Sequence, residues 1–243
     1  ALNKGEQARV HRWETALTGG RAALATEAWD GDWYKRAFFD DGTPLGTHTR
    51  HEGRIDLIAQ AWAVLSGVAS PERQQLAMAA VEEHLVNAEA GLIQLLAPAL
   101  RHSEPSAGYI QAYPPGVREN GGQYAHGGVW ALMAAAALAV QASPQAGGGD
   151  AEALGDVPYR YFTYLSPAHR AQHAEWGPSY GVEPYVMAAD TYSQPPYVGR
   201  GGWSWYTGSA AWMHRAALES LFGLELQAGK LRLRPVLPTH WPH

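Results

Sequence analysis

Apolar residues recur at helical spacing in several segments of this chain, and long loops rich in glycine and aromatic residues separate these segments. The clearest segment covers residues 52–66, where the apolar positions three or four residues apart are Ile55, Ile58, Trp62 and Leu65. This alternation predicts a mostly helical domain. Because long loops inside a compact domain are usually functional, we expect the site where loops lead into helices.

Helix-start signals and apolar spacing define the expected elements. Ser70 and Pro71 are typical of the N-cap and the first position of a helix. Trp13, Leu17 and Leu24 are the expected anchors of the first helix. Helices are expected at residues 5–28, 52–66 and 71–87, within 119–142, at 151–165 with an interruption at Pro158, and at 209–222, and a strand is expected at 231–238.

About six helices with elaborate loops at one end indicate half of a twelve-helix α/α toroid. We therefore expect an all-α fold, in which residues 1–225 form part of the barrel. Residues 226–243 are expected to begin a further, truncated β segment at the C-terminus.

The choice of aromatic residues is uneven, with 10 Trp and 12 Tyr against 4 Phe. Trp and Tyr combine a flat apolar face with a polar group, which suits a cleft that stacks sugar rings. A tryptophan-rich core without a ligand is an equally open interpretation of the composition.

Charge and composition argue against several classes of protein. A net charge of -5 and the lack of a long Lys/Arg run argue against a nucleic-acid partner. The sequence has no cysteine, which excludes disulfides and thiol chemistry. We find no apolar run of the roughly 18 residues that a membrane span requires. The first ten residues, ALNKGEQARV, lack the apolar core of a signal peptide.

Two loop-to-helix junctions carry the candidate site residues, and the first is PPGVRENGGQYAHGGVWALM, residues 114–133. Its glycine pair allows close backbone approach between Glu119 on one side and Tyr124 and His126 on the other. His126 could donate a hydrogen bond to an anion or transfer a proton. The alternative is a helix N-terminus with a fully hydrogen-bonded histidine, but the surrounding ENGG favours function.

The second junction is GRGGWSWYTGSAAWMHRA, residues 199–216, and we expect its helix to begin at Ser209. Free N–H groups and the helix dipole favour an anion near Thr207 and Gly208, and hydroxyl groups add donors. A simple Ser/Thr cap is the alternative. Trp203 and Trp205 are expected to line a sugar cleft or to brace the loop.

Several common site motifs do not occur in the sequence. It contains no GxxxxGK[ST] loop, no HExxH and no GxSxG. His48, His51 and Glu52 lie in a polar loop and are poor candidates for a metal site, so no metal is expected. Spacing does not choose a catalytic pair among the aspartates of residues 30–41, because Asp-Gly turns explain at least two of them.

Five motifs occur in an order that resembles a known family: WYKRAFFDDGTPLG, EGRIDLIAQAWAVLSG, GYIQAYPPGVRENGGQYAHGGVWALMA, VEPYVMAADTYS and GRGGWSWYTGSAAWMHRA. Together they closely resemble the catalytic region of glycoside hydrolase family 94, over nearly the whole chain. The nearest likeness is to 1,2-β-oligoglucan phosphorylases and to the C-terminal region of cyclic β-1,2-glucan synthases. The sequence does not decide between these two, and cellobiose and chitobiose phosphorylases are more distant.

The resemblance implies an (α/α)6 barrel and the inverting phosphorolysis of β-1,2-glucooligosaccharides to α-glucose 1-phosphate. Inorganic phosphate would be the co-substrate, and no cofactor is expected. A single carboxylic acid would protonate the leaving oxygen, because phosphate replaces the water and the base of an inverting hydrolase.

The resemblance also implies roles for individual residues. His126, Thr207 and Gly208 match the phosphate-binding positions of the family. Glu119 matches a position near the acceptor sugar. The other expected substrate-binding residues are Tyr124, Arg54, Asp56, Arg200, Trp203 and Trp205.

The chain departs from the family pattern at the general acid. The family's acid is the Asp of a Trp-Asn-Asp motif upstream of the histidine segment, and no Trp-Asn-Asp occurs here. Asp30 and Asp32 belong to a different motif. We therefore expect no catalytic residue in these 243 residues. The remainder of the barrel is expected on the parent chain or a partner chain, and the isolated chain should have little or no phosphorylase activity. The expected location is the cytoplasm, with attachment to an inner-membrane protein in a full-length synthase.

Two further interpretations stay open. A non-catalytic carbohydrate-binding or scaffolding module derived from this fold would bind glucan without turnover. An inverting hydrolase would need a second carboxylate as its base and would release glucose without phosphate.

Overall fold

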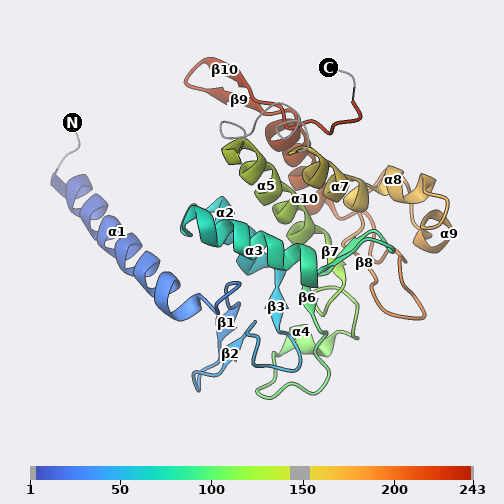
Figure 1. Ribbon diagram of the computed structural model, residues 1–243, viewed down its shortest axis with the longest axis horizontal. Coiled ribbons are helices and arrows are strands. Elements are labelled where there is room, and N and C mark those ends of the chain that lie inside the picture. Colours follow the sequence, from blue (N-terminus) through green and yellow to red (C-terminus); the bar gives the residue numbers. More distant parts are fainter. Residues whose placement is uncertain (1–3, 143–153, 242–243) are drawn as a thin grey trace.

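The computed structural model describes residues 4–142 and 154–241, and most of its secondary structure is helical (Figure 1). The helices are α1 (Lys4–Ala23), α2 (Leu57–Leu65), α3 (Pro71–His84), α4 (Tyr109–Ala112), α5 (Ala125–Ala142), α7 (Asp156–Leu165), α8 (Pro167–Gln172), α9 (Gly177–Tyr180) and α10 (Thr207–Arg215). Two π-helical turns continue α1 and α10, namely η1 (Leu24–Ala28) and η2 (Ala216–Leu221). The predominantly helical expectation is thus confirmed.

Helix α5 lies at the centre of the core and packs against both α2 and α7. Two glycines in its first turn make this close approach possible. A Cβ at Gly128 would lie 2.5 Å from Cδ2 of Leu165 in α7, and a Cβ at Gly127 would overlap Leu95. The core therefore holds the start of α5, and with it the first junction, in one place.

Helix α5 is also long and apolar enough to cross a membrane, with 18 residues and a mean hydropathy of 1.3. The expectation that no segment meets this criterion is therefore wrong. Within the molecule 56% of this segment is buried. Such burial is typical of a core helix, which passes the same test of length and composition.

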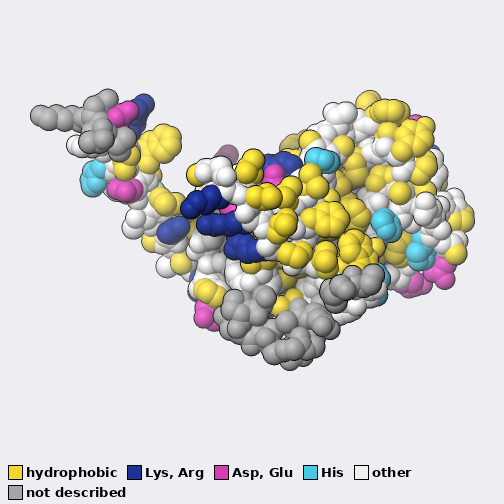
Figure 2. All heavy atoms as spheres, turned by 90° about the horizontal axis from the view of Figure 1, so that it is seen from above, with side chains coloured by type: hydrophobic (Ala, Val, Ile, Leu, Met, Phe, Trp, Pro, Cys, Tyr) yellow, Lys and Arg dark blue, Asp and Glu magenta, His cyan; other side chains and the backbone are white. Residues whose placement is uncertain are grey.

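Helix α1 projects away from the other helices (Figure 1) and forms a separate lobe in the space-filling view (Figure 2). Trp13 is 70% exposed and Leu17 is 56% exposed. The expectation that Trp13, Leu17 and Leu24 anchor this helix is wrong, because the described part of the chain leaves all three exposed.

Helix boundaries differ from the expectation where pairing with distant segments intervenes. Residues 55 and 56 form strand β3 (Ile55–Asp56) and pair with β6 (Leu96–Ala97), so α2 begins only at Leu57. Pro158 does not interrupt α7, because it lies in the first turn, where no backbone donor is needed. Helix α3 begins at Pro71 with Ser70 as its N-cap, as predicted.

The described residues contain five two-stranded antiparallel pairs, whereas the sequence indicated β structure mainly at the C-terminus. Besides β3 with β6, the pairs are β1 (Ala37–Phe38) with β2 (Pro44–Leu45), β4 (Val86–Asn87) with β5 (Leu92–Ile93), β7 (Gln123–Tyr124) with β8 (Asp190–Thr191), and β9 (Leu224–Gln227) with β10 (Lys230–Leu233). The strand expected at 231–238 ends at Leu233 and is the second strand of a hairpin. Strands β3 and β7 directly precede α2 and α5, so these pairs position both helix starts.

Candidate functional site

A cavity of about 450 Å³ lies between α2, α4, α5 and α10. Its polar and aromatic wall includes Arg36, Asp56, Glu119, Tyr124, His126 and Trp130. All of these except Arg36 and Trp130 are candidates that the sequence predicted. The volume is within the usual range of ligand pockets, about 300–1,000 Å³.

His126 lies in the first turn of α5 and faces the second junction. A Cβ at Gly208 would lie 3.3 Å from Nε2 of His126, so the imidazole directly contacts the start of α10. The Nδ1 atom is buried and has no hydrogen-bond partner among the described residues. Burial lowers the pKa of His126, which favours a neutral ring at neutral pH.

Helix α10 begins at Thr207, two residues earlier than expected. Thr207 and Gly208 therefore lie within its first turn, and the preceding residue, Tyr206, provides no side-chain cap. The Ser209 hydroxyl donates to the carbonyl oxygen of Tyr206 at 2.9 Å. The first backbone N–H groups of such a helix have no partner within the helix, so they are available to an anion beside His126.

The turn that follows Glu119 fixes its position, because Asn120 and Gly121 in this turn have structural roles. Asn120 is completely buried, and its side chain accepts from the N–H of Leu100 at 2.7 Å and donates to the Leu100 carbonyl at 2.8 Å. Gly121 has a φ of +86°, which an L residue rarely adopts. The Oε2 atom of Glu119 is buried without a hydrogen-bond partner among the described residues, on the wall of the cavity.

Asp56 is the N-cap of α2 and is only 5% exposed. Its Oδ1 accepts from the N–H of Ile58 at 2.8 Å, and its Oδ2 lies 3.3 Å from Nε of Arg36. Burial raises the pKa of Asp56 to about 6, although Arg36 and the backbone hydrogen bonds oppose this rise. The carboxyl group thus caps α2 and pairs with Arg36 at the cavity wall. Its raised pKa means that it gains or loses its proton at a pH of about 6.

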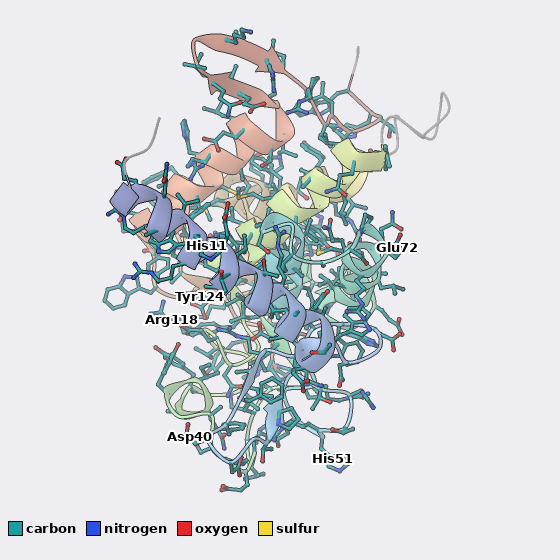
Figure 3. The ribbon with its side chains drawn as sticks, turned by 90° about the vertical axis from the view of Figure 1, so that its left-hand side faces the viewer. His11, Asp40, His51, Glu72, Arg118 and Tyr124 are labelled. Atoms are coloured by element: carbon teal, nitrogen blue, oxygen red, sulfur yellow. The ribbon has the colours of Figure 1, made fainter. Side chains whose placement is uncertain are left out.

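Tyr124 and Tyr206 connect the two junctions. Their hydroxyl oxygens lie 2.8 Å apart, and the Tyr206 ring packs edge-on against His126 with centroids 5.2 Å apart. Burial and the hydrogen bond to Tyr206 raise the pKa of Tyr124, so it remains protonated. Figure 3 shows Tyr124 beside Arg118 in the same part of the molecule.

The remaining sequence candidates do not line this cavity. Arg54 and Arg200 have exposed side chains, and the Arg200 guanidinium lies 5.5 Å from the ring centroid of Tyr197. Trp203 is 73% exposed. Trp205 lines a second cavity of about 510 Å³, together with Thr207.

Several residues of the cavity wall escaped the sequence analysis, and Trp130 and Arg36 are two of them. Trp130 is one helical turn after His126, so the i, i+4 spacing on α5 could have revealed it. Its indole packs edge-on against Trp62 and Trp212, and its Nε1 is buried without a hydrogen-bond partner among the described residues. Arg36 comes from a loop distant in sequence, and no local signal indicated it.

A search of residues 4–142 and 154–241 finds no cluster of three or more His, Asp or Glu side chains that could hold a metal ion. The loop histidine considered from the sequence has another role. Nδ1 of His48 lies 2.7 Å from Oδ2 of Asp30, and Glu52 accepts from the N–H groups of Arg101 and His102.

The chain is similar to several curated proteins. The chain is 44% identical over its whole length to the cyclic beta-(1,2)-glucan synthase NdvB of Rhizobium meliloti, of which it spans 8%. It is 34% identical over 91% of its length to solabiose phosphorylase of Paenibacillus borealis, and 28% identical over 98% to N,N'-diacetylchitobiose phosphorylase of Vibrio proteolyticus. It spans 26% and 28% of those two enzymes.

Residues 1–223 match the family described as glycosyl hydrolase 94 superfamily, catalytic domain. This match covers both junctions and every residue of the cavity wall. The chain therefore belongs to the glycosyl hydrolase 94 superfamily.

Proposed function

We propose that the chain is part of an inverting β-glucan phosphorylase, which uses inorganic phosphate to cleave β-1,2-glucooligosaccharides and releases α-glucose 1-phosphate. One observation carries this proposal: Nε2 of His126 faces Gly208 at the uncapped start of α10, beside the cavity that contains Glu119. Two segments about 80 residues apart in sequence thereby form one anion-binding corner.

The buried polar atoms of the cavity support a hydroxyl-rich ligand. Oε2 of Glu119, Nδ1 of His126 and Nε1 of Trp130 are all buried without partners among the described residues. An unpaired buried polar group typically costs about 1–3 kcal/mol, so such groups are usually retained for a ligand. Sugar hydroxyl groups both donate and accept hydrogen bonds, and they therefore match this mixed set.

We further propose that the described helices are the C-terminal part of an (α/α)6 barrel, whose remaining helices lie on the parent chain or on a partner chain. The exposed apolar side chains of α1 support this arrangement, and Figure 2 shows apolar side chains over much of one face of the molecule. Large exposed apolar patches are typical of surfaces that another segment covers. The 44% identity to the glucan synthase favours the phosphorylase region of such a synthase as the parent.

The general acid is proposed to lie in that remaining part, because no Trp-Asn-Asp sequence occurs among these 243 residues. The isolated chain should then bind phosphate and glucan without releasing glucose 1-phosphate. Release of glucose 1-phosphate by the chain alone would show that an acid within it suffices. Glucan binding with no phosphate binding would instead favour a non-catalytic carbohydrate-binding module.

Calorimetric titration of inorganic phosphate tests the proposed anion site directly. We expect His126→Ala to weaken phosphate binding by about tenfold or more, since a hydrogen bond to a charged group contributes about 1.5–3 kcal/mol. His102→Ala, at an exposed histidine outside the cavity, is the matched control and should bind as the wild type does. Equal affinities of the two variants, or no phosphate binding by the wild type, would refute the assignment.

A further inference from the structure

Arg118 adopts a backbone conformation that is uncommon for a residue with a side chain. Its φ is +51°, in the left-handed region. Its N–H donates to Oδ2 of Asp190 at 2.6 Å, and its carbonyl oxygen accepts from the N–H of Gly122 at 3.1 Å. Glycine would keep both hydrogen bonds without the strain, so the turn itself does not require an arginine.

The Arg118 side chain has an unpaired donor inside an aromatic setting. Its guanidinium carbon lies 5.6 Å from the ring centroid of Tyr206 and 5.9 Å from that of Tyr113. The Nη1 atom is buried and has no hydrogen-bond partner among the described residues. A strained backbone together with an unpaired buried donor is typical of a residue retained for function.

Unpaired acceptors lie in the same neighbourhood. Oε2 of Glu119 and Oδ1 of Asp190 are both buried without partners among the described residues. Arg118 and Glu119 both act electrostatically on the hydroxyl group of Tyr124, which lines the cavity. Figure 3 shows Arg118 and Tyr124 close together, so Arg118 lies next to two residues of the cavity wall, Glu119 and Tyr124, although it does not itself line the cavity.

These groups match neighbouring sugar hydroxyls better than they match an anion. A hydroxyl group accepts from a guanidinium and donates to a carboxylate, which would satisfy Arg118 and Glu119 together. The carboxyl groups of Glu119 and Asp190 lie near the single positive charge of Arg118, so this place has no excess of positive charge. An anionic ligand is therefore disfavoured here.

We propose that Arg118 binds hydroxyl groups of the sugar unit next to Glu119 and favours a neutral sugar over an acidic one at this position. The inference rests on the proposed function, because it takes the cavity to be a glucan site. It adds a substrate-binding residue, Arg118, whose positive φ strains the folded backbone.

The test compares Arg118→Gly and Arg118→Lys with Ala228→Gly. Ala228 has a φ of +49° in the exposed turn of the β9–β10 hairpin, so its glycine variant relieves the same kind of strain away from the cavity. Without sugar, both glycine variants should melt at or above the wild-type temperature. With β-1,2-linked glucotriose as the calorimetric probe, Arg118→Gly should lose about tenfold or more in affinity, Ala228→Gly should lose none, and Arg118→Lys should lose less than Arg118→Gly.

The possible outcomes distinguish a failure of the Arg118 inference from a failure of the proposed function. Wild-type affinity of Arg118→Gly for the glucotriose, or a melting temperature below that of the wild type, would overturn the role of Arg118 alone. Tighter binding of glucuronic acid than of glucose by the wild type would overturn the preference for a neutral sugar. Failure of the wild type to bind the glucotriose at all would overturn the glucan site as well, and the phosphate titration would still test His126 independently.

Discussion

Asp56→Asn removes the buried charge at the cavity wall while keeping the cap of α2. Burial raises the pKa of Asp56 from 3.8 to about 6, and this difference corresponds to about 3 kcal/mol lost by the folded state when the carboxyl group ionises. Asparagine retains an oxygen that accepts from the N–H of Ile58. Its amide N–H group would face the guanidinium of Arg36, which is also a donor, and the lost pairing should lower the free energy of unfolding by about 1 kcal/mol. We therefore expect a net gain of about 2 kcal/mol at neutral pH.

The gain should depend on pH in a defined direction. A carboxyl group whose pKa is higher in the folded chain than in the unfolded chain binds its proton more tightly when folded. The stability contributed by Asp56 is therefore fully present below pH 3.8 and is lost as the pH rises through about 6. Asparagine does not titrate, so the stability difference between variant and wild type should grow across this interval.

Urea unfolding at several pH values between about 4 and 8 measures this difference. Asp56→Ala is the control that also removes the cap, and it should be less stable than Asp56→Asn by about 1 kcal/mol. A difference between Asp56→Asn and the wild type that stays constant with pH would refute the reasoning. So would an asparagine variant that is less stable than the wild type at neutral pH.

Three further predictions concern the junctions. Gly202→Ala would place a methyl group onto Oδ1 of the buried Asp190 and should lower the free energy of unfolding by about 2 kcal/mol, and an unchanged urea midpoint would contradict this packing. Tyr124→Phe removes the 2.8 Å hydrogen bond to Tyr206 and should cost about 1 kcal/mol in thermal unfolding followed by circular dichroism, whereas a more stable variant would contradict it. Because burial lowers the pKa of His126, its NMR titration midpoint should lie below 6.5 in the free chain and rise when phosphate binds. A midpoint at or above 6.5 without phosphate would contradict the buried environment of this side chain.

Much of the candidate site could be predicted because its chemistry is local in sequence. The Glu119 to His126 segment and the Thr207-Gly208 pair each combine a glycine turn with a helix start, and both were found from that pattern. The structure brings His126 and Gly208 into contact through the packing of α5 against α10. Trp130 was detectable by its helical spacing from His126, but Arg36 was not, because only the folding of residues 29–49 against α2 brings it to the wall.

A short strand was expected within residues 33–39, where β1 lies, but the strands that precede α2 and α5 could not be predicted. Each strand of β3 with β6, or of β7 with β8, is two residues long, which is too short for a period-2 pattern. Their hydrogen bonds join segments about 40 and 68 residues apart, so no local propensity records them. They nevertheless decide where α2 and α5 begin, and hence where Asp56 and His126 lie.

The sequence by itself determined the approximate positions of the longer helices and both junctions, since these depend on residue order within a short window. It also determined the family, through five motifs spread along the chain. It also determined that the Trp-Asn-Asp acid motif does not occur in these residues. Only the tertiary structure decided that Asp56, Glu119, Tyr124 and His126 share a cavity while Arg54, Arg200 and Trp203 do not line it. The physical reason is that burial, unpaired hydrogen-bonding groups and shifted pKa values arise from neighbours that are distant along the chain.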